Sequence, residues 1–344
     1  MVSSSTDNKI AVALSGGVDS AVAAALVIQN YGSENTIGVT LKLLDNKQDK
    51  ENILIAKKIC QRLGIEHKTL DGRKIFRETI IEKTLADYTQ GLTPNPCVYC
   101  NQLIKFGFLL KEILSGNKAS LVASGHYARV IKDKGRYKLH LGRDSKKDQA
   151  YFLAFLKQKQ LSKIIFPLGE MKKEEIRKKA RALNLEIADR PESQDVCFVN
   201  ENFGTFLEKN IEKKPGEIVD LNGKVLGAHQ GLAFYTVGQR KGLGGGLRKP
   251  YYVIGSDKRK NRLVIGEREA LYKKRLIAKD INWISSQDIP TELVCQAQIR
   301  SSAKKTFCQI KKKEKNQLEV IFKEAQRAIT PGQIIVFYQG EEVL

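Results

Sequence analysis

The sequence lacks any apolar run long enough to cross a bilayer, and its first residues, Met1–Lys9, are polar rather than those of a signal peptide. Acidic residues are scarce, because 38 Asp and Glu stand against 59 Lys and Arg, for a formal net charge of +21. We therefore expect a cytoplasmic protein that does not act at a membrane. Because thiols stay reduced in that compartment, the six cysteines are not expected to form a disulfide framework.

The basic excess has no single source such as a charged tail. Runs of Lys and Arg recur along the whole chain, for instance at Lys146–Lys147, Lys258–Lys260 and Lys311–Lys313. Any one run is typical of a solvated surface, but the total favours a polyanionic partner such as RNA. A length of 344 residues with 42% apolar residues allows two or three domains with substantial cores.

The chain also lacks a Walker A motif, yet one stretch near its start has the composition of an anion site. Ile10–Ser20 reads IAVALSGGVDS, an apolar run followed by a Gly-containing turn and then a helical pattern. A strand that turns at glycines into a helix presents backbone N–H groups to an anion. Ser15 and Ser20 add hydroxyl donors. Asp19 is explained most easily as a ligand of a metal ion or as a hydrogen-bond acceptor for an N–H of the loop. A purely structural turn is the alternative reading of the two glycines.

Strands and helices alternate in the first half of the chain. Thr36–Leu43 and Ile65–Leu70 are predicted buried strands, and Asp49–Leu63 and Arg73–Gln90 have helical spacing of apolar residues. Ser120–Ile131 is predicted to be a further strand that ends at Gly125-His126. This pattern predicts an α/β fold, a doubly wound parallel sheet with helices on both faces. Ligands of such sheets bind at the carboxyl ends of the strands, where the glycine turn is expected to lie.

Two cysteines, Cys97 and Cys100, lie three residues apart in the stretch TPNPCVYCNQLIKF. The two prolines before them predict an extended, non-helical segment, and Asn101–Leu114 is predicted to continue as a helix. A helix N-terminus stabilises a nearby thiolate. In a reducing compartment this spacing indicates redox, metal or sulfur chemistry, unless the two cysteines are incidental residues of a loop.

The other four cysteines give weaker signals. Cys60 lies on the apolar face of a predicted helix, and Cys295 and Cys308 alternate with apolar residues in predicted strands, so all three are expected in cores. Cys197 follows a polar turn, and its meaning depends on whether the fold brings it to Cys97 and Cys100.

The helical periodicity ends near Phe203. Lys214–Gly227, with Asn222-Gly223 at its turn, and Pro250–Ile265 are predicted hairpins. Short strands dominate from about Ala278, which predicts a small β-barrel, a common RNA-binding accessory. We therefore expect three domains: an α/β domain at 1–202, a small, mainly β domain at 203–274, and a C-terminal β-barrel at 275–344.

The motif SGGVDS resembles the pyrophosphate loop of the ATP pyrophosphatases (PP-loop enzymes), which adenylate a substrate oxygen, but alone it does not choose among them. The motifs PNPCVYCNQLIKF, ASGHYAR, KDQAYFL, HQGLAFYTVGQRKGLG and TPGQIIVFY, with Cys197 in its polar turn, follow it along the chain. In this order they resemble the tRNA-specific 2-thiouridylases (the MnmA family), over nearly the whole chain.

The resemblance implies an enzyme that binds ATP with Mg²⁺ and tRNA, with Lys, Glu and Gln acceptors as the expected substrates. It adenylates the carbonyl oxygen at position 2 of the wobble uridine and replaces it with sulfur, releasing AMP and pyrophosphate. A cysteine desulfurase or a sulfur-relay protein would supply the sulfur. Cys100 would be the nucleophile, and Cys197 would carry the persulfide.

The resemblance also assigns contacts residue by residue. The expected ATP contacts are Ala13, Leu14, Ser15, Gly16, Gly17, Val18, Asp19, Ser20, Leu41 and Gly125. The residues expected to face the target base are Asn95, Pro96 and Cys97. The expected tRNA contacts are His126, Lys147, Asp148, Gln149, Arg300, Ser301 and Gln333.

Two positions depart from the family pattern. Many members have Asp where this chain has Cys97, and an aromatic residue where it has Ser301. Cys97 opens a second mechanism, in which Cys97, Cys100 and Cys197 hold a [4Fe–4S] cluster whose fourth iron site binds hydrosulfide. In the persulfide route, which we favour, Cys197 carries the sulfur and Cys100 assists its release or forms a transient disulfide with Cys197.

Two further functions remain open from the residues alone. One is a PP-loop synthetase that acts on a small molecule, which would need neither the basic excess nor three site cysteines. The other is a non-catalytic RNA-binding protein with a vestigial loop.

Overall fold

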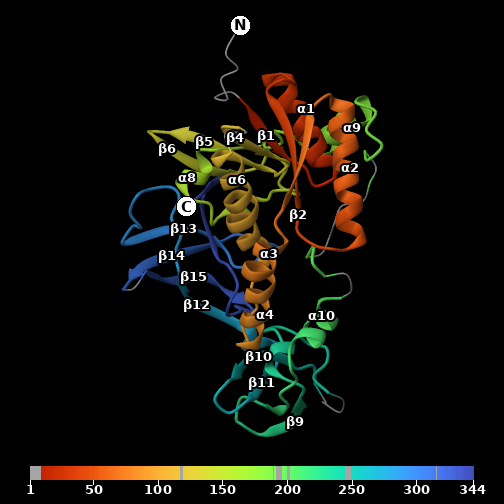
Figure 1. Ribbon diagram of the computed structural model, residues 1–344. Helices are drawn as coiled ribbons and strands as arrows, with labels where there is room; N and C mark the ends of the chain where they lie inside the picture. The colour runs from red at the N-terminus through yellow and green to blue at the C-terminus, as the bar shows by residue number, and fades with distance from the viewer. Residues whose placement is uncertain are drawn as a thin grey trace.

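A computed structural model of the chain describes residues 9–116, 119–188, 190, 196–199, 202–244, 249–314 and 316–344 (Figure 1). One sheet has five strands: β1 (Ile10–Ala13), β2 (Thr36–Lys42), β3 (Glu66–Asp71), β4 (Leu121–Ser124) and β7 (Ile164–Ile165). Its order is β3-β2-β1-β4-β7, and all of its neighbouring strands are parallel. The predicted parallel α/β sheet is confirmed.

Helices cover both faces of this sheet. On one side Ile10 and Val12 of β1 pack with Ala24 of α1 (Val18–Tyr31) and Cys60 of α2 (Lys47–Leu63). On the other side the alternate β1 residue, Ala11, packs with α6 (Leu109–Ser115). The period-two alternation of a strand therefore explains the two cores. Cys60 is fully buried, as predicted.

Two long helical stretches contain π-helical turns. The first runs through α3 (Arg73–Phe76), η2 (Arg77–Ile81) and α4 (Glu82–Thr89), and the second through α5 (Pro96–Tyr99), η3 (Cys100–Phe108) and α6. The prediction of a non-helical segment through Pro96 was wrong, because Pro96 is the first residue of α5, where the missing N–H costs nothing. The two cysteines therefore lie within the helix. The shorter helices of this half are α7 (Ala150–Leu153), α8 (Gln158–Leu161) and α9 (Lys173–Ala182).

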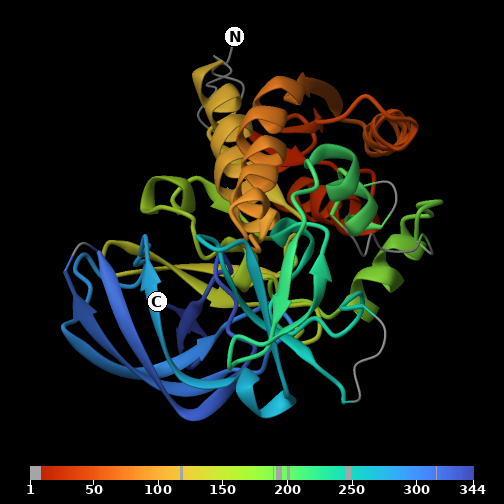
Figure 2. The same ribbon diagram turned by 90° about the horizontal axis from the view of Figure 1, so that it is seen from below.

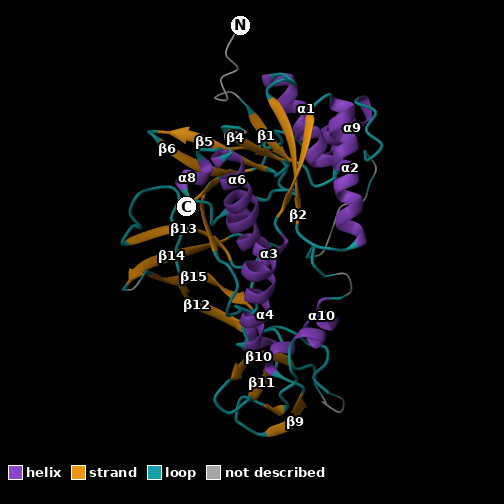
Figure 3. Ribbon diagram, viewed as in Figure 1, coloured by secondary structure: helices purple, strands orange, loops and turns teal. Residues whose placement is uncertain are grey.

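A second, four-stranded sheet has the order β10-β11-β8-β9. Its strands are β8 (Gly216–Val219), β9 (Val225–His229), β10 (Tyr252–Asp257) and β11 (Arg262–Gly266), and the elements beside it are α10 (Phe203–Asn210), η4 (Leu232–Phe234) and η5 (Arg268–Leu271). The antiparallel pairs β8–β9 and β10–β11 confirm both predicted hairpins. Figure 3 shows the change in character, with most helices in the upper part and mainly strands and loops below.

The third sheet has eight strands, in the order β12-β15-β14-β13-β16-β17-β6-β5 (Figure 2). Its members are β5 (Ala128–Asp133), β6 (Arg136–Leu141), β12 (Tyr272–Lys279), β13 (Glu292–Gln298), β14 (Thr306–Lys313), β15 (Gln317–Arg327), β16 (Val336–Gln339) and β17 (Glu342–Val343). Cys295 and Cys308 are buried cross-strand neighbours in it, which confirms their place in a core.

The strand predicted in Ser120–Ile131, which was expected to end at Gly125-His126, is confirmed as β4. The strand β4 ends at Ser124, and β5 belongs to a different sheet, where β6 joins it to the C-terminal strand β17. The hairpin β5–β6 therefore comes from the first half of the chain but completes the sheet of the last domain. Among the described residues, no helix is long and apolar enough to span a membrane.

Candidate functional site

The glycine loop between β1 and α1 is held compact by its own polar groups. Gly16 has a φ of +75°, and a Cβ there would lie 2.8 Å from the carbonyl oxygen of Asn52. The Oγ of Ser20 accepts a hydrogen bond from the N–H of Ser15 (3.2 Å) and donates one to the carbonyl of Gly17 (2.9 Å). The turn thus needs glycine for its backbone conformation and for close approach.

Gly125 closes the other side of this loop. A Cβ on Gly125, just beyond β4, would lie 2.8 Å from the carbonyl carbon of Asp19 and 2.8 Å from the backbone N of Ser20. The chain after β4 therefore runs against the first turn of α1, where free backbone N–H groups attract anions. Such a cradle, which a single methyl group would fill, fits a phosphate-binding loop.

The Asp19 carboxylate has two partners that the sequence did not indicate. The Nζ of Lys173 lies 2.7 and 2.8 Å from its two oxygens, and the hydroxyl of Tyr127 donates a hydrogen bond of 2.6 Å to it. Lys173 was visible only as part of a basic helix, where nothing distinguished it from its neighbours. Arg190 also reaches the loop, since its guanidinium donates to the carbonyl of Gly16 (3.0 Å).

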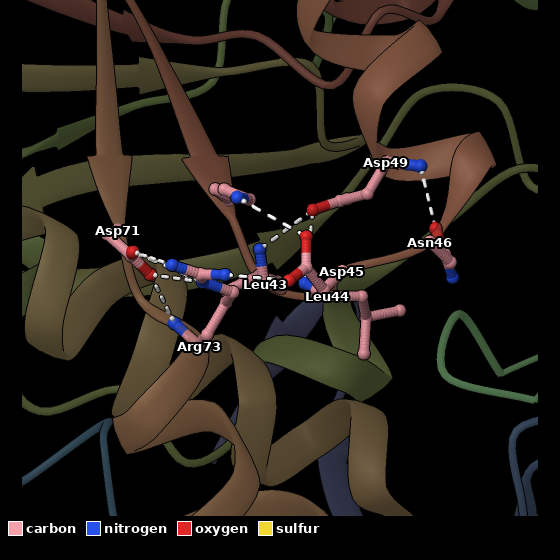
Figure 4. Close-up of polar contacts among 8 residues, drawn as sticks. Leu43, Leu44, Asp45, Asn46, Asp49, Asp71 and Arg73 are labelled. Carbon is pink, nitrogen blue, oxygen red and sulfur yellow. Dashed lines mark hydrogen bonds and ion pairs between the residues drawn. The ribbon is translucent and has the colours of Figure 1, made fainter.

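A polar cluster pins the carboxyl ends of β2 and β3 (Figure 4). Asp49 accepts hydrogen bonds from the backbone N–H groups of Leu43 (3.0 Å) and Leu44 (3.1 Å). Arg73 pairs with Asp71 at 2.6 Å, and its hydrogen bonds lower the pKa of that carboxyl to about 2. These contacts fix the backbone directly after Leu41, the expected nucleotide contact on β2.

The structure brings the segment of Cys197 to the two helical cysteines. Phe198 is buried in one cluster with Cys100 and Phe76, and the rings of Phe76 and Phe198 meet edge to face at 5.9 Å. Leu41 packs against the same cluster. The cluster of Cys100 and Phe198 therefore lies at the end of the parallel sheet where the glycine loop also lies. The fold thus brings the segment of Cys197 to Cys100, as a shared role of the cysteines requires.

The thiols of this site are disfavoured as anions. Burial raises the pKa of Cys97 and Cys100, and it raises that of Cys197 to about 12, even though the Cys197 residue is exposed at the surface. The nearby charge of Lys105 opposes the rise at all three cysteines. Desolvation therefore outweighs the stabilisation of a thiolate that was expected from the helix N-terminus.

Among the described residues, no group of three or more His, Cys, Asp or Glu side chains has the arrangement to hold a metal ion.

Several residues expected to contact tRNA have side chains that hydrogen-bond to the backbone of the protein itself. The Gln149 side chain accepts from the N–H of Tyr127 (3.0 Å), and Asp148 accepts from that of Gly142 (2.8 Å). His126 lies between the rings of Phe106 and Phe166, and desolvation lowers its pKa well below the ordinary value. Lys147 is half-buried, and Ser301 is exposed.

Arg300 and Gln333 lie where the N-terminal, central and C-terminal parts of the chain meet. Arg300 donates to the carbonyls of Val237 (3.2 Å) and Ala328 (3.0 Å) and to the hydroxyl of Thr330. The side chain of Gln333 donates to the carbonyl of Thr93 (2.8 Å), at the start of the loop that holds Asn95, Pro96 and Cys97. Contacts of these residues with tRNA stay predictions.

The parallel sheet, the glycine loop and the helices on both faces define a PP-loop nucleotide-binding protein, a class whose loop binds ATP. Family models match the chain as a tRNA methyl transferase HUP domain (residues 8–201), a tRNA methyl transferase PRC-barrel domain (204–267) and an aminomethyltransferase beta-barrel domain (273–344).

The relatives identify the family. The chain is 45% identical over 352 residues to the tRNA-specific 2-thiouridylase MnmA of Carboxydothermus hydrogenoformans, covering 98% of this chain and 96% of the relative. It is 44% identical over 338 residues to the enzyme of the same name from Syntrophomonas wolfei, covering 98% of each. The chain belongs to the MnmA family of tRNA-specific 2-thiouridylases. A solved structure of the U34-tRNA thiolase NcsA from Methanococcus maripaludis aligns with 60% of this chain and 65% of that one, at 22% identity and a TM-score of 0.36.

Proposed function

We propose that the protein replaces the oxygen at position 2 of the wobble uridine of tRNA with sulfur, at the expense of ATP. The observation that supports this proposal is that Leu41 of β2 packs against the cluster of Cys100 and Phe198, because β2 is the neighbour of β1, whose carboxyl end leads into the glycine loop. The names of the full-length relatives supply the activity.

The reaction needs both halves of this site. The uridine oxygen attacks the α-phosphate of ATP and pyrophosphate leaves, which turns a poor leaving group into AMP. The terminal sulfur of a Cys197 persulfide then attacks C2 of the uracil and AMP leaves. A disulfide bond now joins the base to Cys197, and the Cys100 thiol gives its proton to the departing base as its sulfur attacks the Cys197 sulfur of that bond. This step releases the thiocarbonyl and leaves a Cys100–Cys197 disulfide, which an external thiol reduces.

We assign the ATP, base and tRNA contacts as the resemblance implies them, with the exception of Arg300, whose hydrogen bonds within the protein favour a structural role. The loop residues Ala13–Ser20 with Leu41 and Gly125 would bind ATP, and the cradle at Gly125 supports this. Asp19, whose carboxylate is paired with Lys173 in this structure, would be the carboxylate ligand for the Mg²⁺ that neutralises the departing pyrophosphate. Asn95, Pro96 and Cys97 would face the uracil, which must be flipped out of its stack to be reached.

The partners and the compartment belong to the same proposal. We expect tRNA with Lys, Glu and Gln acceptors, and a cysteine desulfurase or sulfur-relay protein as the sulfur donor, all in the cytoplasm. The proposed domains are 1–202, 203–274 and 275–344. The ranges of the family models support these boundaries, and the hairpin β5–β6 adds a strand contact between the first and the last domain.

The cluster mechanism is the alternative, and Cys97 distinguishes it. The described residues offer no metal site as they lie, so no step is derived through a cluster. Anaerobic reconstitution with iron and sulfide, followed by iron analysis, compares Cys97→Ala with the parent protein. The persulfide route predicts that the variant still forms 2-thiouridine and keeps the iron content of the parent protein. Loss of both bound iron and activity would establish the cluster route.

The activity is tested with the purified protein, unmodified tRNA, ATP, a cysteine desulfurase and cysteine. Mass analysis of the digested nucleosides should show 2-thiouridine, and Cys197→Ser should abolish it while ATP–pyrophosphate exchange with tRNA persists. Cys295→Ala, in the distant barrel core, is the control and should keep activity. Exchange that is indifferent to tRNA would favour a small-molecule synthetase, and full thiolation by Asp19→Ala would contradict the enzymatic role of the loop.

A further inference from the structure

Lys173 places a buried ammonium group directly on the ATP loop. The residue is 8% exposed, whereas its neighbour Lys172 is exposed to solvent. Its Nζ lies within 3 Å of both Asp19 oxygens, at 2.7 and 2.8 Å, and 5.9 Å from the centre of the Tyr127 ring.

Helix packing fixes this position. Lys173 is the first residue of α9, and Ile176 of the same helix is fully buried in one cluster with Val18 and Ala21 of α1. The helix that begins at the ATP loop and the helix that begins at Lys173 are therefore packed together. The N–H of Lys173 also donates to Asp144 (2.9 Å), which anchors the backbone of this first turn.

The pair is poorly explained by stability alone. The Lys173 side chain is 10% exposed and that of Asp19 is 29% exposed, and taking a charge out of water offsets much of the attraction that an ion pair returns, so such a pair is weak evidence for a stabilising role. A lysine ammonium is, in contrast, a common point-charge ligand for phosphate. Asp19 is itself part of the loop expected to hold the triphosphate, where an unpaired carboxylate would repel it.

We propose that Lys173 binds the phosphate chain of ATP, and that Asp19 holds its ammonium group in place until the nucleotide arrives. The Asp19 carboxylate, no longer paired with Lys173, would then be able to ligate the Mg²⁺ that accompanies the nucleotide. The inference rests on the proposed function, because it needs the glycine loop to bind ATP, and it adds a ligand from outside that loop.

Binding experiments separate the phosphates from the nucleoside. Titration calorimetry measures the Kd of the full-length protein for α,β-methylene-ATP, which cannot be cleaved at the bond that the reaction breaks, and for adenosine. With Mg²⁺ present, Lys173→Met should weaken the analogue by about tenfold or more, as expected for a lost charge-assisted contact, and change the adenosine Kd less than about twofold. Lys173→Arg should keep part of the affinity, and Lys172→Met, the matched control, should equal the parent protein.

A second variant tests the role of Asp19. In EDTA, Asp19→Asn should bind the analogue more tightly than the parent protein, because the carboxylate no longer competes for Lys173. Equal losses for analogue and adenosine, or an unchanged Kd in Lys173→Met, would overturn the inference alone. Failure of the parent protein to bind the analogue would instead overturn the proposed function.

Discussion

Gly125 illustrates how little room the nucleotide site leaves for a side chain. Its missing Cβ would lie 2.8 Å from backbone atoms of both Asp19 and Ser20, which cannot move without shifting the first turn of α1. Small misplacements of such groups are expensive for binding and catalysis. A methyl group at Gly125 is therefore expected to displace the backbone of the glycine loop and so to weaken nucleotide binding.

We accordingly predict that Gly125→Ala lowers the affinity for ATP by about tenfold or more. The measurement is the Kd for α,β-methylene-ATP. Gly227→Ala is the control, since a Cβ at Gly227 meets no atom within 4 Å. Equal affinities in the two variants would show that the approach at Gly125 does not shape the nucleotide site.

Arg300 has two competing explanations, a contact with tRNA and a brace inside the protein. Its hydrogen bonds to Val237, Ala328 and Thr330 join the central region to the barrel. We predict that Arg300→Met lowers the free energy of unfolding by about 2 kcal/mol, as expected for the loss of several hydrogen bonds, and leaves the salt dependence of tRNA binding unchanged. Urea denaturation and salt titrations of the tRNA Kd measure the two effects. A logarithmic salt slope lower by about one unit, with unchanged stability, would instead indicate a phosphate contact.

At the scale of elements, the segment 196–199 depends on one aromatic anchor. Phe198 is 8% exposed and packs against Phe76 and Phe206, and it shares a cluster with Cys100. Because Phe198 packs beside Cys100, it holds the neighbouring residue Cys197 near Cys100.

Phe198→Ala should therefore cost about 3 kcal/mol of stability, typical of a truncated buried aromatic. It should also abolish thiolation at temperatures where the variant is still folded, while tRNA-dependent ATP–pyrophosphate exchange persists. Phe307→Ala is the matched control, because Phe307 is 56% exposed, and its effect on stability should stay within about 0.5 kcal/mol. Thiolation at the parent rate by folded Phe198→Ala would contradict the anchoring role.

The elements also show what the sequence can predict. The alternation of apolar runs with helical spacing was sufficient for the parallel sheet, because burial on both faces leaves a direct pattern. The helix start at Pro96 was not predicted, because proline fits both an extended segment and a first helical turn. That the hairpin β5–β6 joins the last sheet was not predicted, because its partner strand β17 is far along the chain, and local patterns carry no information about distant pairing.

The candidate site divides in the same way. Its glycines and cysteines were identifiable because their chemistry is tied to residue type. The partners of Asp19, Arg300 and Gln333 were not, because they come from other elements that only the fold brings near.

At the scale of the whole molecule, the loop before Cys97 is tied to all parts of the chain. The N–H of Thr93 donates to the carbonyl of Pro331 (2.9 Å), and the Thr93 hydroxyl lies 3.2 Å from that of Thr236. Together with the contact from Gln333, these bonds hold the start of the loop that we propose to face the base against both the central region and the barrel. The accessory sheets therefore position the site as well as extending the surface.

Burial of the histidines predicts how the whole fold responds to acid. Desolvation lowers the pKa of all four, His67, His126, His140 and His229. Between pH 7.5 and 5.5 the unfolded chain therefore takes up protons near pH 6.5 that the folded protein does not, so stability falls as the pH falls. Thermal unfolding should show a lower Tm at pH 5.5 than at pH 7.5, and His126→Gln should reduce the difference. An equal or higher Tm at pH 5.5 would contradict this.

The central claim is that the sulfur on the product passes through Cys197. The direct measurement loads the protein with ³⁴S from labelled cysteine and a desulfurase, removes the donor, and starts a single turnover with tRNA and ATP. Mass analysis of the nucleosides should find ³⁴S-2-thiouridine in an amount approaching that of the enzyme, and none with Cys197→Ser. Labelled 2-thiouridine formed by Cys197→Ser at the parent level would contradict the account.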